Sequence, residues 1–132
     1  MRIGQLAQSS QTPIDTIRYY ERLGLLPQAP RSASGYRHYQ NEDVSRLRFI
    51  RRAKALGFSL AEIEELLTIS AARHGDMAAL RDRTAATLAA VNHRIAELER
   101  MQHGLQALLD QCPGHGALTQ CPILSALEET AA

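Results

Sequence analysis

The chain of 132 residues contains no tryptophan, four tyrosines, two phenylalanines and only two cysteines. So few aromatic side chains argue against a thick globular core and favour thin, helical packing. No apolar run approaches the ~18 residues needed to cross a bilayer, and the first residues include no secretory apolar segment. We therefore expect a cytoplasmic protein with no membrane partner, built as one compact domain or as a small domain with an extended element.

The sequence also lacks the motifs that mark common enzyme sites. It contains no glycine-rich phosphate loop, no metal-hydrolase helix motif and no nucleophile elbow. No internal repeat or low-complexity segment interrupts it either. We predict that the protein is not an enzyme.

Charge is unevenly distributed along the chain, although the formal net charge is only +1. Residues 1–54 carry ten Arg or Lys against four acidic residues, whereas residues 55–132 carry five Arg against ten acidic residues. A basic segment joined to an acidic one is typical of a part that binds a polyanion, followed by a part with another role.

Residues 3–24 predict two short helices joined by a tight turn. Thr12 is a good N-cap for the second helix, with Pro13 at its first position and Asp15 where it can reach back to the cap. The second helix ends near Gly24 and carries Arg and Tyr side chains. This pattern fits a helix-turn-helix that binds DNA; the alternative is an ordinary helical hairpin with a solvated basic face.

The segment after the second helix predicts a wing. It reads LLPQAPRSASGYRHYQ, is bounded by proline, and alternates aromatic and basic residues after Gly35. Alternation of this kind indicates a short two-stranded ribbon. Interleaved Arg and Tyr side chains on an exposed ribbon beside a basic helix can bind phosphates through charge and hydroxyl groups.

Two further helices are predicted over residues 42–56 and 60–69. Asn41 is the expected N-cap of the first of them. Ser59 and Glu62 form a capping box at the start of the other. Because that helix is acidic, we assign it to packing rather than to DNA contact.

Residues 78–111 contain no proline and a single glycine, so they predict one helix roughly 50 Å long at about 1.5 Å per residue. Apolar residues repeat along it at alternating steps of four and three, which is a heptad seam. The small N-terminal domain cannot bury such a seam alone, so we expect a homodimer. The alternative is that the helix folds back on the N-terminal domain of its own chain. The seam residues expected to dimerise are Leu88, Val91, Ile95, Leu98, Leu105 and Leu109, with Thr84 and Gln102 as polar interruptions.

The order of these features resembles the MerR family of transcription regulators across essentially the whole chain. The segments that carry the resemblance are IRYYERLGLL, RSASGYRHY, GFSLAEIEELL and CPGHGALTQCPIL. The short tail with two cysteines is similar to the metal-sensing branch that includes the copper regulator CueR and the zinc regulator ZntR. The resemblance implies a mainly α fold with a winged helix-turn-helix DNA-binding domain at 1–70, a linker at 71–77, a dimerisation helix at 78–111 forming an antiparallel coiled coil, and a metal-binding loop with a short C-terminal helix at 112–132.

The resemblance also implies a mechanism. A dimer of this family binds double-stranded promoter DNA whose two recognition elements are spaced too far apart for RNA polymerase. It represses while empty, and it distorts and underwinds the DNA when the effector binds; such deformation costs several kcal/mol, which differential protein contacts can supply. Matched by position, the expected DNA contacts are Arg18, Tyr19, Tyr20, Arg31, Tyr36, Arg37, Tyr39 and Lys54, with Arg52 beside the last. Most should hold phosphates, and Arg18 is the best candidate for a base edge. The alternative for the tyrosines, above all Tyr20, is a ring in the core with only the hydroxyl outward.

Cys112 and Cys121 are the only thiols, and eight residues separate them in a loop marked by glycine and proline. Paired thiolates are soft ligands that suit Cu(I), Ag(I), Hg(II), Zn(II), Cd(II) or Pb(II). Two sulfurs alone suit linear coordination, which monovalent coinage metals accept, whereas tetrahedral divalent ions want four ligands. Because no third cysteine exists, we favour Cu(I) or Ag(I) over Zn(II), Cd(II), Pb(II) and Hg(II).

Further donors would decide the class of metal. In the divalent sensors of the family a third cysteine comes from the partner subunit, and in copper-type members the position holds serine; here it is Met77, which is either a soft ligand or an apolar lid. His115 is either a third donor within the loop or an exposed residue, and His74 and Asp76 are weaker candidates. The spacing of the cysteines resembles the divalent sensors, whereas the CPG and CPIL segments resemble the copper sensors. A disulfide-based redox sensor is the main alternative of another kind.

Overall fold

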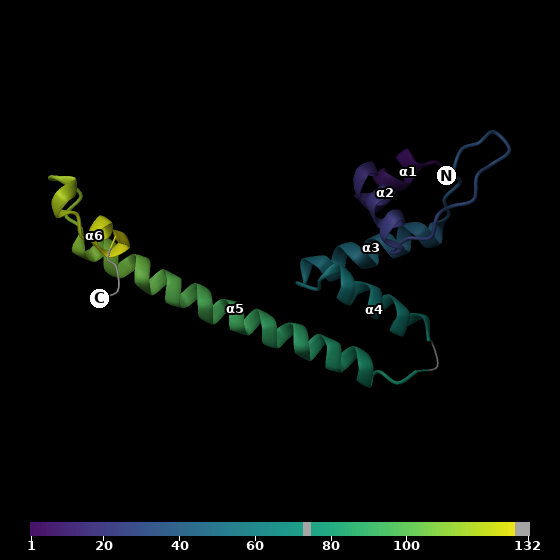
Figure 1. The fold of residues 1–132 in the computed structure, drawn as a ribbon. Helices are drawn as coiled ribbons and strands as arrows, with labels where there is room; N and C mark the ends of the chain where they lie inside the picture. Colours follow the sequence, from purple (N-terminus) through teal and green to yellow (C-terminus); the bar gives the residue numbers. More distant parts are fainter. Residues whose placement is uncertain (73–74, 129–132) are drawn as a thin grey trace. The chain divides into compact units, whose positions relative to one another are not determined.

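The computed structural model describes residues 1–72 and 75–128 and is mainly helical, as predicted (Figure 1). In chain order the elements are α1 (Ile3–Ser10), α2 (Ile14–Leu23), α3 (Asn41–Ala55), α4 (Leu60–Ala71), α5 (Ala78–Gln111), the 3-10 helix η1 (Leu118–Gln120) and α6 (Pro122–Glu128). Two compact units divide the chain, one from Met1 to Thr87 and the other from Leu88 onward. Within the described ranges, none of the helices combines the length and the apolar character that crossing a bilayer requires.

The core of the first unit lies between α1, α2, α3 and α4. Helix α1 packs against α2 and α3, and α3 packs against α4. Apolar residues recur every three or four positions along these helices, so each presents one stripe to the core. The buried residues are Leu6 from α1, Ile17 and Tyr20 from α2, Val44, Leu47, Ile50 and Ala53 from α3, and Ile63, Leu66 and Leu67 from α4, joined by Leu25, Leu26, Ala29 and Tyr39.

The turn between α1 and α2 differs from the prediction at Thr12. Gln11 closes α1 in the left-handed region, with φ of 53°, and the Thr12 N–H donates to the carbonyl of Ala7 (3.0 Å). The Thr12 side chain is buried, and its hydroxyl donates to the carbonyl of Ser10 (3.2 Å). The N-cap of α2 is Pro13, without a side-chain capping bond. The predicted cap at Thr12 was wrong because the turn already uses this side chain.

The starts of α3 and α4 both use a carboxylate three residues past the N-cap. Helix α3 starts one residue earlier than predicted, since Gln40 is its N-cap and its N–H donates to Asp43 Oδ2 (2.9 Å). The predicted capping box of α4 is confirmed: the Ser59 N–H donates to Glu62 Oε1 (2.9 Å), and the Glu62 N–H donates to Ser59 Oγ (3.2 Å). Hydrogen bonds to the Glu62 carboxylate from the backbone and the side chain of Ser59, followed by one from Thr87, hold the pKa of Glu62 below its ordinary value.

The wing, residues 27–39, holds less β structure than predicted. A single antiparallel bridge joins Arg31 to Arg37, and it is the only β pairing in the described part of the chain. Gly35, with φ of 87°, closes the tip, where its N–H donates to the carbonyl of Ser32 (2.9 Å). A regular ladder cannot extend toward the base because Pro30 has no N–H to donate.

The first three turns of α5 belong to the first unit. Leu80 packs against its core, and Thr87 is buried with its hydroxyl donating to Glu62 Oε2 (3.3 Å). Arg83 forms an ion pair with Glu65 of α4. The division between the two units therefore falls inside α5 and not in the segment 71–77, while the domain boundaries stay predictions.

The second unit contains the rest of α5, the loop that follows it, η1 and α6. Helix α5 has the predicted bounds, Ala78–Gln111, and Gly104 does not interrupt it. Gly114 and Gly116 have φ of 83° and 112°, so both use the left-handed region that favours glycine, and the loop can turn back within a few residues. Helices η1 and α6 pack against each other.

Candidate nucleic-acid interface and thiol site

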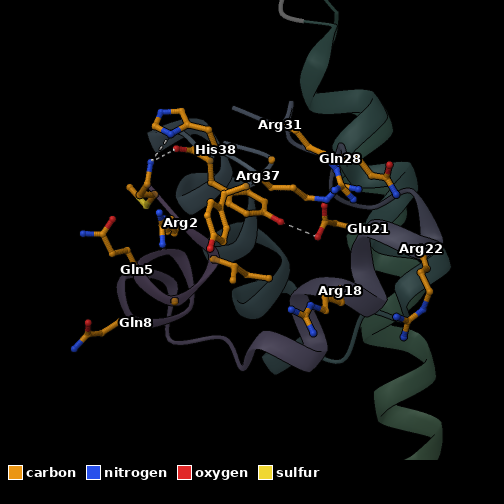
Figure 2. A pocket seen from close by; sticks show the side chains of 16 residues that line it. Arg2, Gln5, Gln8, Arg18, Glu21, Arg22, Gln28, Arg31, Arg37 and His38 are labelled. Atoms are coloured by element: carbon orange, nitrogen blue, oxygen red, sulfur yellow. Dashed lines mark hydrogen bonds between the residues drawn. The ribbon is translucent and has the colours of Figure 1, made fainter. Parts of the chain in front are cut away.

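A cavity of about 1240 Å³ lies between α1, α2 and the wing of the first unit (Figure 2). Its lining contains five arginines and one histidine but a single carboxylate, which belongs to Glu21. Such an excess of cations suits a polyanion. The basic and amide side chains that line the cavity are those of Arg2, Gln5, Gln8, Arg18, Arg22, Gln28, Arg31, Arg37 and His38.

Helix α2 and the wing position the charges of this cavity. Arg18 and Arg22 are four residues apart, so they share one face of α2. Arg37 Nη1 donates to the carbonyl of Ala29 (2.9 Å), which orients its guanidinium. The guanidinium of Arg2 lies 3.9 Å from the centroid of the Tyr36 ring, a cation–π contact.

The arginines of the cavity keep their charge free for a ligand. Three ion pairs occur among residues 1–72 and 75–128, and they involve Arg83, His93 and Arg94 only. A phosphate in the cavity would therefore meet guanidinium groups that no protein carboxylate neutralises at close range.

Tyr39 joins the wing to α2 from inside the core. Its side chain is 1 % exposed, its hydroxyl donates to Glu21 Oε1 (3.0 Å), and its N–H donates to the carbonyl of Met1 (2.7 Å). Burial, followed by the hydrogen bond to Glu21, raises the pKa of Tyr39 to about 12. Tyr39 lines the cavity, although its ring is buried and its hydroxyl bonds Glu21, and its contact with DNA stays a prediction.

The other predicted DNA contacts fall into three groups. Arg18, Arg31, Tyr36 and Arg37 are brought together in the cavity. Tyr19 is 44 % exposed and lies beside it, with the Arg22 guanidinium 5.8 Å from its ring centroid, and Lys54 is exposed on α3 outside the cavity. Tyr20 is buried in the core, which agrees with its alternative interpretation, and its contact with DNA stays a prediction.

Several lining residues were missed by sequence reasoning, notably Arg2, Arg22 and Gln28. The position of Arg22, four residues after Arg18 on one helix, was a signal that could have found it. Arg2 gives no such signal, since its place over the Tyr36 ring depends on how the chain start meets the wing.

The thiol site lies in the second unit, where the loop joins α5 to α6. Cys112 directly follows α5, and its N–H donates to the carbonyl of Leu109 (3.2 Å). Cys121 separates η1 from α6, and its carbonyl accepts from the Ser125 N–H (3.0 Å). Both cysteines are free and half-buried.

The surroundings of Cys121 favour a thiolate. The pKa of Cys121 is lowered first by the backbone N–H of Leu124, then by the N–H of Ile123 and by a hydrogen bond with the Cys112 thiol, against the opposing effect of desolvation. The N–H groups of Leu124 and Ile123 at the start of α6 thus favour the thiolate form of Cys121, and the Cys112 thiol adds to this effect. This donor set fits a soft cation, since thiolates are soft ligands and must be deprotonated to bind.

The candidate additional donors lie in different parts of the chain. His115 Nδ1 lies 3.1 Å from the carbonyl of Pro113, in its own loop, and Met77 is 81 % exposed in the first unit. Asp76 Oδ1 accepts from the Ala78 N–H (3.2 Å) at the start of α5, and His74 lies outside the described residues. Among the residues described, no group of three His, Cys, Asp or Glu could hold a metal ion.

The predicted heptad seam of α5 is uncovered in the single chain. Apolar side chains along its second-unit part are 38 % to 64 % exposed, an unusual amount of apolar surface for one helix. The exposed seam residues are Leu88, Val91, Ile95, Leu98, Leu105 and Leu109, with Met101 also exposed.

Comparisons with known proteins agree with this arrangement. Residues 1–68 match the MerR HTH family regulatory protein family, and residues 44–108 match the MerR, DNA binding family. The chain is 38 % identical over 126 residues to the mercuric resistance operon regulatory protein of Bacillus cereus, covering 96 % of each chain. It is 43 % identical over 133 residues to the HTH-type transcriptional regulator ZntR of Escherichia coli K12, covering 98 % of this chain and 94 % of that protein.

A solved structure extends the similarity to the whole fold. The transcription regulator PbrR691 from Ralstonia metallidurans CH34, in complex with lead(II), superposes with a TM-score of 0.87 at 32 % identity, covering 96 % of this chain and 98 % of that chain. These relatives are DNA-binding transcription regulators, so the protein is not an enzyme. The chain belongs to the MerR family of helix-turn-helix regulatory proteins.

Proposed function

We propose that this protein is a transcriptional regulator that binds promoter DNA as a homodimer and responds to a thiophilic metal ion held by Cys112 and Cys121. One observation carries the metal part of the proposal: the two free cysteines lie at the two ends of the loop that joins α5 to α6, where backbone N–H groups lower the pKa of Cys121. The relatives named for mercury, zinc and lead agree with a soft metal.

DNA binding rests on the basic cavity of the first unit. Arg31, Tyr36 and Arg37 reach it from the wing and would contact phosphates, which positions the duplex without reading its sequence. Arg18 lies on α2 and is the residue proposed to reach a base edge. Tyr19 and Lys54 are exposed and complete the proposed contacts.

The homodimer is proposed because the apolar side chains of the α5 seam are exposed in the single chain and a second subunit would bury them. A helix whose Leu98 and Leu105 are 48 % and 64 % exposed gains stability when a second apolar surface covers them, at roughly 25 cal/mol for each Å² buried. A second copy of the same helix supplies a matching seam. The antiparallel sense follows from the family.

The donor count favours Cu(I) or Ag(I). Two thiolates satisfy linear coordination, and the described residues of one chain offer no third His, Cys, Asp or Glu beside them. A divalent ion such as Zn(II), Cd(II), Pb(II) or Hg(II) is the alternative, favoured by the names of the relatives, and it would draw on His115 or on Met77 of a second subunit. A thiol redox sensor is the second alternative. It is favoured because the Cys112 thiol is one of the groups that lower the pKa of Cys121, and two cysteines near each other could form a disulfide.

In the proposed mode of action the regulator represses while empty and activates when loaded. Cys112 and Cys121 would hold a monovalent ion as thiolates, which leaves one negative charge that the backbone N–H groups at the start of α6 would stabilise. The loaded dimer would hold the promoter in a bent and underwound form that RNA polymerase can use. Smooth bending of a short site costs of order 1–6 kcal/mol, so a modest difference in protein contacts between the two states is sufficient.

The test is a competitive titration of the reduced protein with Cu(I), Ag(I), Zn(II), Cd(II), Pb(II) and Hg(II). Thiolate-to-metal absorption reports binding, and transcription in vitro from a promoter carrying a selected binding sequence reports activation. Cys112→Ser should bind DNA like the parent and fail to activate transcription. His115→Ala and Met77→Leu test for a third donor, because a variant that lacks a metal ligand should bind the metal more weakly in the same titration. Peroxide-driven activation without any metal response would move the assignment to the redox alternative.

A further inference from the structure

A second basic cavity, of about 440 Å³, lies in the first unit between the C-terminal end of α1 and one face of α3. Arg48, Arg51 and Arg52 form the face of α3. Arg51 and Arg52 follow Arg48 by three and four residues, so all three side chains lie on one side of the helix. The lining of this cavity contains no acidic residue. Gln8 and Gln11 form part of the opposite wall.

Two of the three guanidinium groups are held in place by the turn between α1 and α2. Arg48 Nη2 donates to the carbonyl of Ser9 (3.0 Å), and Arg51 Nη1 donates to Gln11 Oε1. No hydrogen bond or ion pair of Arg52 occurs in the described part of the chain. The remaining N–H groups of all three side chains are therefore free for a ligand.

Capping of α1 explains only one of these arginines. Helix α1 has no basic residue in its last turn, so Arg48 supplies the cation that the carbonyl end of a helix favours. Among the described residues, Arg52 makes no hydrogen bond with the carbonyl end of α1. Like charges three or four residues apart destabilise a helix by a few tenths of a kcal/mol per pair, so the cluster has a cost for α3. Three cations that converge without an acid point to an anion that is bound during function.

The position of the cavity indicates which anion. Gln8 lines this cavity and also the larger cavity shown in Figure 2, so the two basic cavities adjoin along α1. A duplex offers a regular row of phosphates, and a ligand of that kind can occupy both cavities at once. An isolated acidic side chain of a protein would satisfy only one.

We propose that Arg48, Arg51 and Arg52 form a second phosphate site, which receives a backbone phosphate of the same duplex that occupies the larger cavity. This inference rests on the proposed DNA-binding function. The site anchors the duplex without reading bases, so it contributes equally to all sequences.

Arg51→Gln and Arg52→Gln test the site because each removes one charge and keeps a polar side chain. Arg52 makes no hydrogen bond among the described residues, so this variant should fold like the parent, which thermal unfolding verifies. Arg100→Gln is the matched control, since Arg100 is exposed on α5 and belongs to neither cavity. Dissociation constants are measured by fluorescence anisotropy over a series of salt concentrations, with a selected operator duplex and with an unrelated duplex.

Each lost phosphate contact should make the slope of log K against log salt shallower by about 0.9. A fourfold rise in salt should then weaken the variant about 3.5-fold less than the parent for each lost contact. The loss of affinity should be equal on both duplexes. Replacing single phosphates by neutral methylphosphonates should reveal one position at which the parent loses affinity and Arg51→Gln does not.

Parent-like slopes for both variants, with parent-like thermal unfolding, would overturn the inference. Unchanged DNA affinity combined with weaker transcription would also overturn it, because the site would then serve an acidic protein partner. Arg18→Ala separates this failure from a failure of the proposed function. If Arg18→Ala weakens DNA binding while the α3 variants do not, only the second site is lost; if Arg18→Ala also binds like the parent, the DNA interface itself is wrong.

Discussion

Replacing Tyr39 by Phe should destabilise the protein by about 1.5–3 kcal/mol at neutral pH, the usual contribution of a hydrogen bond to a charged group. The hydroxyl of Tyr39 donates to Glu21 Oε1 at 3.0 Å. The other carboxylate oxygen, Oε2, is buried and has no hydrogen-bond partner in the described part of the structure. Among the described residues Tyr39 is the only side-chain donor to the Glu21 carboxylate, so the substitution leaves this carboxylate without one.

The same contact predicts a dependence on pH. The pKa of Tyr39 is about 12 in the folded protein, against 10.0 for an unperturbed tyrosine, so the unfolded chain ionises first as the pH rises. The stability from the neutral hydroxyl is complete below pH 10 and is lost as the pH approaches 12. At pH 11 the parent should have lost about 1.4 kcal/mol of this contribution, whereas the Phe variant has none to lose.

Urea unfolding of the parent and of Tyr39→Phe, at pH 8 and at pH 11 and one protein concentration, measures this difference. The gap between the two proteins should narrow by about 1.4 kcal/mol at the higher pH. Tyr36→Phe is the control, because Tyr36 is 54 % exposed and its hydroxyl makes no hydrogen bond among the described residues. A gap that stays constant between the two pH values would refute the assigned role of the Tyr39 hydroxyl.

Three further predictions concern other parts of the molecule. Ser59→Ala removes the cap of α4 and should cost about 1 kcal/mol in urea unfolding. The pKa of Glu62 is lowered in the folded state, so its contribution should be lost as the pH falls through that pKa; Glu62→Gln should flatten this part of the stability curve, and an unchanged curve would contradict it. Leu98→Asp places a charge in the exposed seam and should give the mass of a single chain in analytical ultracentrifugation at micromolar concentration, while Arg100→Asp, off the seam, should keep twice that mass.

Local signals predicted the helices well where one physical cause acts alone. The absence of proline from residues 78–111 allows α5 to run without interruption, and Ser59 with Glu62 sets the start of α4. Thr12 failed because two local roles competed for one side chain. Its hydroxyl can cap a helix or close a turn, and only the path of the backbone through Gln11 decides between them.

The interface was predicted less completely than the helices because alternation along a wing does not reveal its inner side. Tyr36 and Tyr39 look alike in the sequence, yet one is half exposed and the other is buried against α2. That difference arises from contacts with residues distant in sequence, Glu21 and Met1. The metal class could not be predicted from the sequence for a related reason: the order of residues does not show which side chains lie near the two cysteines.

The Glu62 carboxylate serves two helices at once, because Oε1 closes the first turn of α4 and Oε2 accepts from Thr87 of α5. Position 62 is thus constrained twice, and an aspartate, one methylene shorter, could not span both partners from the same backbone position. Ser59 and Thr87, although far apart in sequence, are tied to each other through this shared acid. Changes at these two places should therefore be non-additive in free energy, and sequence drift at one of them should restrict what the other tolerates.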